Sequence, residues 1–415
     1  MKTPARLLSG AGLTAALLLT VAAPAQPAPF TGPTPTADGK KGGQELPGMP
    51  SALDADAGDA GDAPCTPASR EKAKKQDWSR QRLDLDRLHR YSTGEGVTVA
   101  LIGTGVAPGA TGLKGRVTAG GAAGDDCVGH GTFLAGLIAG DGGDSPRLAG
   151  VAPDARILAL RGTGTRGQAD ADLVVRALRE ATEARAGVIA IAVALPRRDE
   201  ALTRAVADAR RAGAVVIAAA TPDPDRRATE EVPSRTYWPA GEPGVLSVAD
   251  MLPGGARPDS ALPTGGIDLA APGAGVVSGG PRGEGHFLGA GAAVAAAQAA
   301  GAAAVVRATH PDESPGAVAR RLTATAYPAD IPQLDAYAAV TTVLGDSGAA
   351  AGTGRATDPV AVRDTSATDR ATDRATLFVL LGSAAVLAVL WGAFALPRAR
   401  GRGWRPAEAG GPAKD

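Results

Sequence analysis

A histidine followed by a glycine and a small hydroxyl residue is the feature of this chain that points most directly to chemistry. His130, Gly131 and Thr132 stand in the segment Asp125–Gly140, which reads DDCVGHGTFLAGLIAG. The apolar residues after Thr132 recur at helical spacing, so the pattern predicts a helix that begins near His130. Glycine neighbours allow a second backbone or a substrate to approach closely, so His130 is a candidate site residue. A lone histidine is more often structural than catalytic, so this interpretation depends on the rest of the chain.

Metal and nucleic-acid chemistry are not expected. The other histidines, His89, His286 and His310, are scattered along the chain and show no ligand spacing with His130, so the sequence predicts no metal site. No cofactor is predicted either. The 43 basic residues balance the 43 acidic ones, which gives no support to a nucleic-acid partner.

Short β-rich runs alternate with amphipathic helical patterns through the body of the chain. The expected strands are Val97–Ile102, Ile157–Leu160, Val188–Val193, Ala214–Ala220, Val245–Val248 and Ile267–Leu269. The expected helices, besides the one at His130, are Ala169–Ala184, Glu200–Ala212, Ala292–Thr309 and Ser314–Ala326, after a short helical entry at Trp78. This alternation predicts an α/β fold, with a central, mostly parallel sheet covered by helices on both faces. Ligands of such sheets bind beyond the carboxyl ends of the strands, where the turn Gly103-Thr104-Gly105 falls.

The two ends of the chain predict export and a membrane anchor. Residues 1–25 read as a signal peptide, with basic residues, an apolar run and a small-residue cleavage site. Residues 26–75 form an irregular extension, 76–344 the main domain and 345–374 a flexible linker. Residues 375–396 carry no charge and are long enough to span a bilayer. The basic tail, 397–415, should stay cytoplasmic. The expected localisation is the cell membrane, with a single span and the N-terminal domain outside.

The chain has two cysteines, Cys65 and Cys127. Because the expected compartment permits disulfides, we predict that they pair and attach the extension to the domain close to His130. The alternative is two separate thiols.

Five stretches match a known family. They are VTVALIGTGV at Val97–Val106, GHGTFLA at Gly129–Ala135, GVAPDARILAL at Gly150–Leu160, DLAAPG at Asp268–Gly273 and GAAVAAAQAAG at Gly291–Gly301. With these motifs, the region Trp78–Val340 resembles the subtilisin-like serine proteases (peptidase S8), and in particular the membrane-anchored mycosins associated with type VII secretion. The placement of the two cysteines is also mycosin-like. The resemblance implies a subtilisin-like fold.

The family's reaction needs a hydroxyl nucleophile, an imidazole base, a carboxylate and an oxyanion donor. Carried over onto this sequence, the carboxylate position is Gly103, the imidazole is His130 and the nucleophile position is Ala293. The oxyanion asparagine falls at Pro222, which has neither a side-chain donor nor a backbone N–H. Only His130 survives, so the resemblance implies vestigial catalytic positions and an inactive protease homologue.

Other residues are poor substitutes for the missing groups. Ser278, beside two glycines, is interpreted as a turn residue, and Asp125 and Asp126 as a solvated loop. Ala190 and Ala192 replace polar residues on the strand that faces a substrate in the family. We therefore expect a scaffold with a protein partner in a secretion or envelope complex. The alternatives are a module that holds a peptide in the groove without cleaving it, and an active peptidase with displaced residues.

Overall fold

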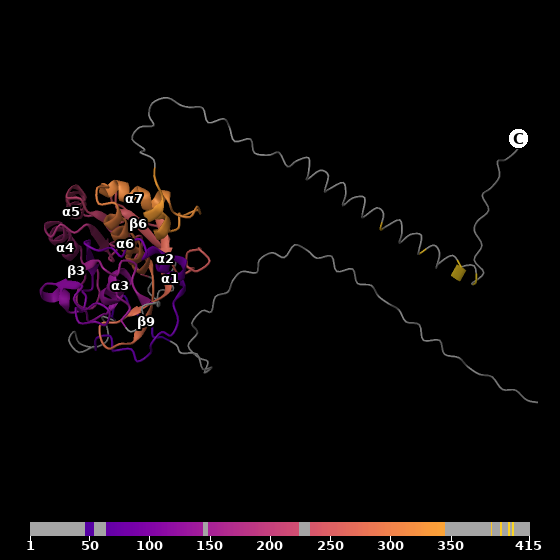
Figure 1. Cartoon of the computed structure of the whole chain (residues 1–415), viewed down its shortest axis with the longest axis horizontal. Helices are drawn as coiled ribbons and strands as arrows, with labels where there is room; N and C mark the ends of the chain where they lie inside the picture. The colour runs from indigo at the N-terminus through magenta and orange to yellow at the C-terminus, as the bar shows by residue number, and fades with distance from the viewer. Residues whose placement is uncertain are drawn as a thin grey trace, which may run out of the picture. The chain divides into compact units, whose positions relative to one another are not determined.

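The computed structural model describes residues 46–53, 64–143, 148–223 and 233–344, with the single positions 383, 391, 397, 398 and 401 (Figure 1). The chain divides into two units, Met1–Val343 and Leu344–Asp415. The expected signal peptide, linker, membrane span and tail lie outside the described residues, apart from those single positions, and stay predictions.

A seven-stranded sheet forms the centre of the domain, and each of its pairings is parallel. Its strand order is β2-β3-β1-β4-β5-β6-β7. The strands are β1 (Thr98–Gly103), β2 (Val117–Ala119), β3 (Arg156–Arg161), β4 (Val188–Ile191), β5 (Val215–Ala219), β6 (Leu246–Met251) and β7 (Leu269–Pro272). The predicted parallel sheet is confirmed. The last strand begins at Leu269, where the predicted one ended.

Helices cover both faces of this sheet, as predicted (Figure 1). Alternate residues of β1 show the two layers. Val99 and Leu101 pack into one apolar core with α3 (His130–Ala139), α6 (Ala292–Thr309), α7 (Pro315–Ala324) and α8 (Ala336–Thr341). Ala100 and Ile102 pack into a second core with α4 (Ala171–Glu183) and α5 (Glu200–Arg211). Because successive strand residues point to opposite faces, a strand buried on both sides is apolar throughout.

Helix α6 runs through the larger core and explains the alanine-rich stretch. Fifteen of its residues, from Ala292 to Val306, are buried, and small side chains let it pack closely against the sheet. Among the described residues it is the one helix long and apolar enough to cross a membrane, but 83% of its apolar window is buried inside the domain. It is therefore a core helix, distinct from the span predicted at 375–396.

Three features were not expected. The strand β2 was not predicted because its sequence, VTA, is short and contains only one large apolar residue. The antiparallel hairpin of β8 (Ala274–Gly279) and β9 (His286–Ala290) is rich in glycine, and α8 has only six residues. The hairpin packs on α3, the helix that begins with His130.

The described part of the extension lies against that hairpin. The backbone N–H of His286 donates to the carbonyl of Glu71, and the backbone N–H of Ala73 donates to Nδ1 of His286. Cys65 and Cys127 form the predicted disulfide. The chain then enters the domain through α1 (Trp78–Arg82) and α2 (Leu85–Leu88), the expected helical entry.

Candidate functional site

Asp126 sets the position of His130, which is the first residue of α3. Oδ1 of Asp126 accepts hydrogen bonds from the backbone N–H of Gly129 and from Oγ1 of Thr104, each 2.8 Å long. Oδ2 accepts from the backbone N–H and from Oγ1 of Thr132, at 2.8 and 2.7 Å. The carboxylate thus supplies partners for donors at the start of a helix and joins that helix to the end of β1.

The prediction of a solvated loop is wrong for Asp126, which is 2% exposed, and fits Asp125, which is exposed. Burial raises the pKa of Asp126, while its four hydrogen bonds act in the opposite direction. Asp126 can be buried because four hydrogen-bond donors converge on its carboxylate and compensate for the loss of water.

Gly131 lets the helix lie directly on the turn after β1. Its backbone N–H donates to Oγ1 of Thr104 over 2.8 Å, and a Cβ at Gly131 would lie 1.9 Å from the carbonyl oxygen of Gly105. A side chain cannot fit there. The close approach inferred from the glycine is real, but it is an approach of backbone rather than of substrate.

The structure brings the three expected positions to the carboxyl end of the sheet and the adjoining helix starts. Gly103 is the last residue of β1, His130 begins α3, and Ala293 lies in the first turn of α6. A Cβ at Gly103 would meet only the Cβ of Ala192, at 3.6 Å, so this position leaves room for a small side chain. Ala293 is buried, and its side chain is only a methyl group.

A carboxylate that the sequence did not single out lies between His130 and Ala293. Oδ2 of Asp223 is 3.3 Å from Nε2 of His130. Its Oδ1 accepts a 3.3 Å hydrogen bond from the backbone N–H of Ala293. Gly291 makes the space: its φ is +126°, and a Cβ there would lie 1.9 Å from Oδ1. The sequence suggested that His130 has no catalytic partner, but in the structure it contacts the carboxyl group of Asp223.

The location of Asp223 has a physical basis. Ala293 belongs to the first turn of α6, where unpaired backbone N–H groups and the helix dipole favour a negative group. A backbone N–H at the nucleophile position is also the type of donor that an oxyanion hole uses. The Asp223 carboxylate thus occupies a donor that a substrate's carbonyl oxygen would need.

Burial dominates the electrostatics of this contact. It raises the pKa of Asp223 to about 7, with the hydrogen bond from Ala293 opposing and the charge of nearby Asp250 assisting the rise. Burial also lowers the pKa of His130 to about 4. Between these values both groups are neutral, so the contact joins an imidazole and a carboxyl group and is not an ion pair.

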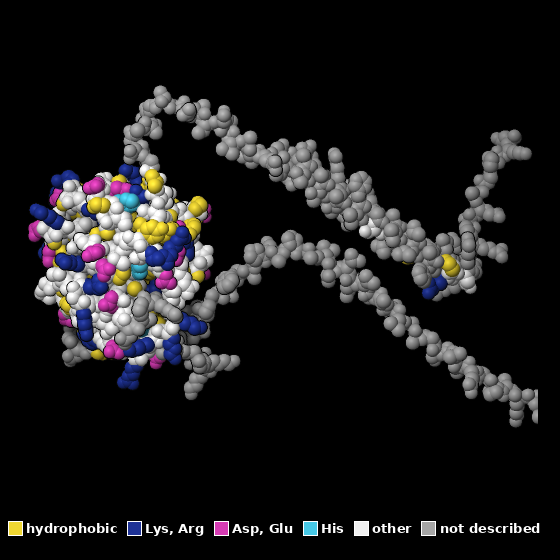
Figure 2. Space-filling model, viewed as in Figure 1, with side chains coloured by type: hydrophobic (Ala, Val, Ile, Leu, Met, Phe, Trp, Pro, Cys, Tyr) yellow, Lys and Arg dark blue, Asp and Glu magenta, His cyan; other side chains and the backbone are white. Residues whose placement is uncertain are grey.

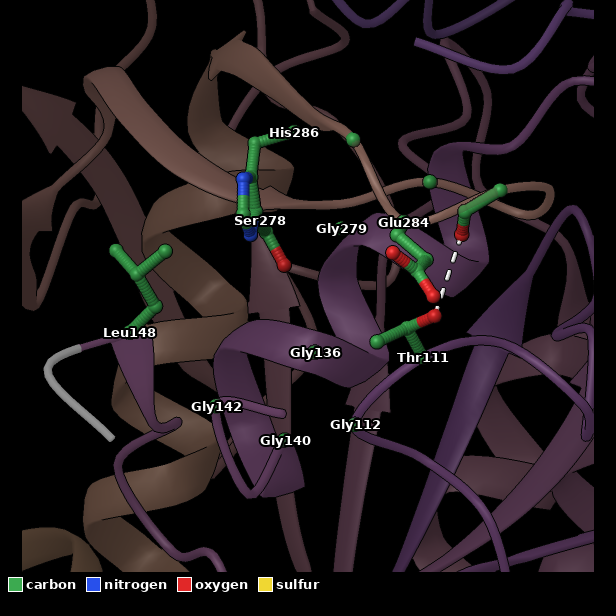
Figure 3. Close-up of a pocket in the computed structure, with 13 residues that line it drawn as sticks. Thr111, Gly112, Gly136, Gly140, Gly142, Leu148, Ser278, Gly279, Glu284 and His286 are labelled. Atoms are coloured by element: carbon green, nitrogen blue, oxygen red, sulfur yellow. Dashed lines mark hydrogen bonds between the residues drawn. The ribbon is translucent and has the colours of Figure 1, made fainter. Parts of the chain in front are cut away.

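Ser278 is not a turn residue, as the sequence suggested, but part of strand β8. Its buried hydroxyl donates a 2.8 Å hydrogen bond to the carbonyl of Phe133 in α3. Figure 3 shows it beside a small glycine-lined pocket that also includes His286 and Gly136. A Cβ at Gly136 would lie 2.4 Å from the Ser278 hydroxyl, so this serine packs against the helix.

The remaining histidines make backbone contacts. Nε2 of His89 lies 3.2 Å from the carbonyl of Val151, and Nε2 of His310 lies 3.0 Å from that of Val340. Within the described segments, no three His, Cys, Asp or Glu side chains gather as a metal site requires. Among these residues the chemistry-bearing contact is therefore that of His130 with Asp223.

The strand expected to face a substrate is partly engaged. Ala190 lies inside β4, which pairs with β1 and β5. Beyond the strand, Leu195 exchanges two backbone hydrogen bonds with Trp238, of 2.7 and 2.9 Å. Main-chain groups that a bound peptide would use at Leu195 are thus already paired within the domain.

Among the described residues, none of the expected catalytic positions carries a hydroxyl nucleophile. His130 faces a carboxyl group, Ala293 has no hydroxyl and Pro222 has no donor. Sequence reasoning missed Asp223 because the residues that it contacts, His130 and Ala293, lie far from it in sequence. The available signal was its place immediately after Pro222, the expected oxyanion position.

Comparison with known proteins gives a consistent identity. The family described as Subtilase family, Peptidase_S8, matches residues 94–371. Mycosin-3 of Mycobacterium tuberculosis is 30% identical over 315 residues, covering 60% of this chain and 66% of the relative. The chain thus spans just under two thirds of that relative's length.

Two solved structures share the fold. One is a MycP3 protease from the type VII (ESX-3) secretion system, with 30% identity and a TM-score of 0.58 over 67% of this chain and 92% of that one. The other is the serine protease MycP1, described as an essential component of the type VII (ESX-1) secretion system. It shows 27% identity and a TM-score of 0.58 over 72% of this chain and all of that one. From its motifs, its parallel sheet and these similarities, the chain belongs to the subtilase family as a mycosin-like member.

Proposed function

We propose that this protein is a catalytically inactive mycosin-like scaffold. It is anchored by one membrane span, with its subtilase domain outside, and it contacts a protein partner in a secretion complex of the type VII class. The single observation that carries inactivity is the position of Asp223 between His130 and the backbone N–H of Ala293.

Two independent losses support this proposal. First, Gly103 and Ala293 stand where the family has its carboxylate and its nucleophile. Removal of the nucleophile or the base lowers the turnover of subtilisin by a factor of about 10⁶. In addition, Asp223 accepts the hydrogen bond of the Ala293 N–H, a donor that would stabilise an oxyanion, so even a restored nucleophile would meet a blocked site.

The choice of a secretion complex follows from the relatives. MycP3 and MycP1 are proteases described as parts of type VII secretion systems. A fold kept around a dismantled reaction centre fits a protein retained for its surface, because binding does not need the nucleophile.

Inactivity is tested by stepwise restoration. The triple variant Gly103→Asp, Pro222→Asn, Ala293→Ser replaces the three lost groups but keeps the blocking carboxylate, so we expect no peptide hydrolysis. Adding Asp223→Gly should give measurable hydrolysis, and adding His130→Ala to this fourfold variant should abolish it. Hydrolysis by the triple variant would show that Asp223 does not block the site. Hydrolysis by the unmodified protein would overturn the proposal.

The scaffold role is tested in the producing cell. Deleting the gene should reduce the amount of an assembled envelope complex, and full-length protein carrying His130→Gln should restore it, because assembly does not use the imidazole. Unchanged complexes after deletion would contradict the scaffold role. Failure of a folded His130→Gln protein to restore assembly would indicate that the protein acts through catalysis.

A further inference from the structure

The exposed large apolar side chains of the domain include two tyrosines that contact residues of α1 and α8. Among the described residues before the predicted linker these exposed side chains are Tyr91, Leu252, Tyr327, Val343 and Leu344. The chain has few aromatic residues, with four tyrosines in all. Two of these are in that set, and a third, Tyr337, touches it. Exposed apolar side chains in contact with one another mark an interaction site more often than scattered single residues do.

Two arginines stack on these tyrosine rings. The guanidinium carbon of Arg87 lies 3.9 Å from the centre of the Tyr337 ring, and that of Arg82 lies 4.2 Å from the centre of the Tyr327 ring. Tyr91 meets Tyr337 edge to face, with ring centres 5.5 Å apart. The rings are therefore held in place, which reduces the entropy that a contact would cost.

Gln333 connects the parts of this surface. Its Oε1 accepts a hydrogen bond from Arg82, its Nε2 donates to the carbonyl of Gly255, and its backbone pairs with Tyr327. Gly255 closes the turn that begins at Leu252. We call this surface the tyrosine face. It consists of Arg82, Arg87, Tyr91, Leu252, Tyr327 and Tyr337. Figure 2 shows hydrophobic and basic side chains side by side over α2.

The tyrosine face is not a strongly charged patch. Asp84 and Asp86 are exposed on and before α2, and Asp84 lies 4.0 Å from Arg87. Attraction between opposite charges is thus a small part of what this surface offers. Tyrosine and arginine side chains have an apolar body and a polar end, and the face also carries an aliphatic side chain. Such residues suit a boundary between an apolar and an aqueous environment.

Tyr337 of this face belongs to α8, the last helix described in the domain. Helix α8 ends at Thr341, Val343 is 94% exposed, and residues 345–374 are the predicted linker to the span at 375–396. A flexible linker of that length has a root-mean-square reach of about 30 Å. A tether of this type gives an effective concentration in the millimolar range, so an intrinsic affinity of about 4 kcal/mol is sufficient for contact.

We infer that the tyrosine face rests on the headgroup region of the lipid bilayer to which the chain is anchored. The partner is the membrane surface itself, which tyrosines and arginine stems enter as in the aromatic belts of membrane proteins. This orientation would turn the opposite side of the domain, with α4 and α5, toward other proteins. The inference rests on the membrane anchor of the proposed function.

The test uses the full chain in lipid nanodiscs. Flotation with liposomes first establishes whether the chain is anchored, so that failure of the anchor is separated from failure of the face. A nitroxide is then attached to Tyr91→Cys or to Tyr327→Cys, with Glu200→Cys on the exposed side of α5 as the matched control. Collision with a water-soluble nickel chelate is measured by electron paramagnetic resonance in nanodiscs and in detergent.

The nickel accessibility at 91 and 327 should fall several-fold in nanodiscs of phosphatidylcholine, while that at 200 should stay unchanged. Equal accessibility at all three sites in an anchored chain would overturn the inference. Protection that appears only when the other envelope proteins are added would also overturn it, because the partner would then be a protein. Both substituted tyrosines are exposed, so the variants should fold.

Discussion

Asp223 gives His130 a carboxyl partner on the side where a subtilase would place substrate. In the family's reaction the carboxylate orients the imidazole from behind, and the nucleophile lies in front. Here Gly103 supplies no carboxylate, and Oδ2 of Asp223 lies 3.3 Å from Nε2. The same two side-chain types are present, but the carboxyl group of Asp223 faces Nε2, the imidazole nitrogen that faces the nucleophile in the family's reaction.

The stability of the protein should report this contact through its pH dependence. Burial raises the pKa of Asp223 to about 7, so the folded state binds the extra proton and its stability falls as pH rises from about 4 to 7. Burial lowers the pKa of His130 to about 4, so its contribution has the opposite sign and stability rises between about 4 and 6.5. In the unmodified chain the two effects largely cancel.

Single variants should separate them. In Asp223→Asn the histidine effect remains, so stability should rise with pH relative to the parent, by about 1 kcal/mol per unit at most. In His130→Gln the aspartate effect remains, so stability should fall with pH over the same range. Urea unfolding at intervals between pH 4 and 7 measures both. Parallel curves for the parent and both variants would show that neither group titrates with a shifted pKa.

At the scale of elements, the start of α3 depends on one buried side chain. Asp126 accepts four hydrogen bonds that join α3 to the end of β1. Asp126→Asn places an amide N–H₂ against donors, so we expect a loss of about 3 kcal/mol in the free energy of unfolding. Asp125→Asn, one residue earlier and exposed, is the matched control and should change stability by less than about 0.5 kcal/mol. Denaturant unfolding of the two variants gives the comparison, and equal losses would contradict the role given to Asp126.

The elements that the sequence predicted well are those with strong periodicity. Strands such as Val215–Ala219 are apolar throughout, and α4 and α5 have one apolar face and an aspartate cap at Asp170 and Asp199. The β8–β9 hairpin was missed because its glycines carry no alternating pattern. Ser278 was consequently assigned to a turn.

Some residues of the site could also be predicted from the sequence, and others could not. Motifs located His130, Gly103 and Ala293, because each lies at the end of a strand or the start of a helix with a family pattern around it. Asp126 and Asp223 could not be assigned from spacing, since their functions depend on donors contributed by distant segments. Ala293 is 70 residues from Asp223 in sequence, and only the folded chain brings them together.

At the scale of the whole molecule, the disulfide holds the extension beside the reaction centre. Cys65 and Cys127 are 62 residues apart, and the neighbouring Thr66 donates to the carbonyls of Cys127 and Val128. In the chain-entropy account, closing a loop of this size contributes about 4 kcal/mol. The double variant Cys65→Ser, Cys127→Ser should therefore unfold at a markedly lower temperature. A reductant should lower the unfolding temperature of the parent and leave that of the variant unchanged, and an equal effect on both would contradict the assignment.

The chain combines a subtilase fold with replacements at expected catalytic positions. A parallel sheet, two helical layers and a fixed histidine are kept, while the nucleophile and the oxyanion side chain are replaced. This combination favours a function in binding. The proposed scaffold role and the proposed membrane contact of the tyrosine face are both functions of this kind.

Labelling with a fluorophosphonate tests the central claim most directly. This probe reacts with an activated serine of a serine hydrolase, so the unmodified full-length protein should remain unlabelled from pH 5 to pH 9. An active mycosin labelled in parallel is the control for the reagent. Intact-mass measurement should give the unlabelled mass alone. A covalent adduct on any serine of the folded protein, lost in the His130→Ala variant, would show an active site and contradict the account.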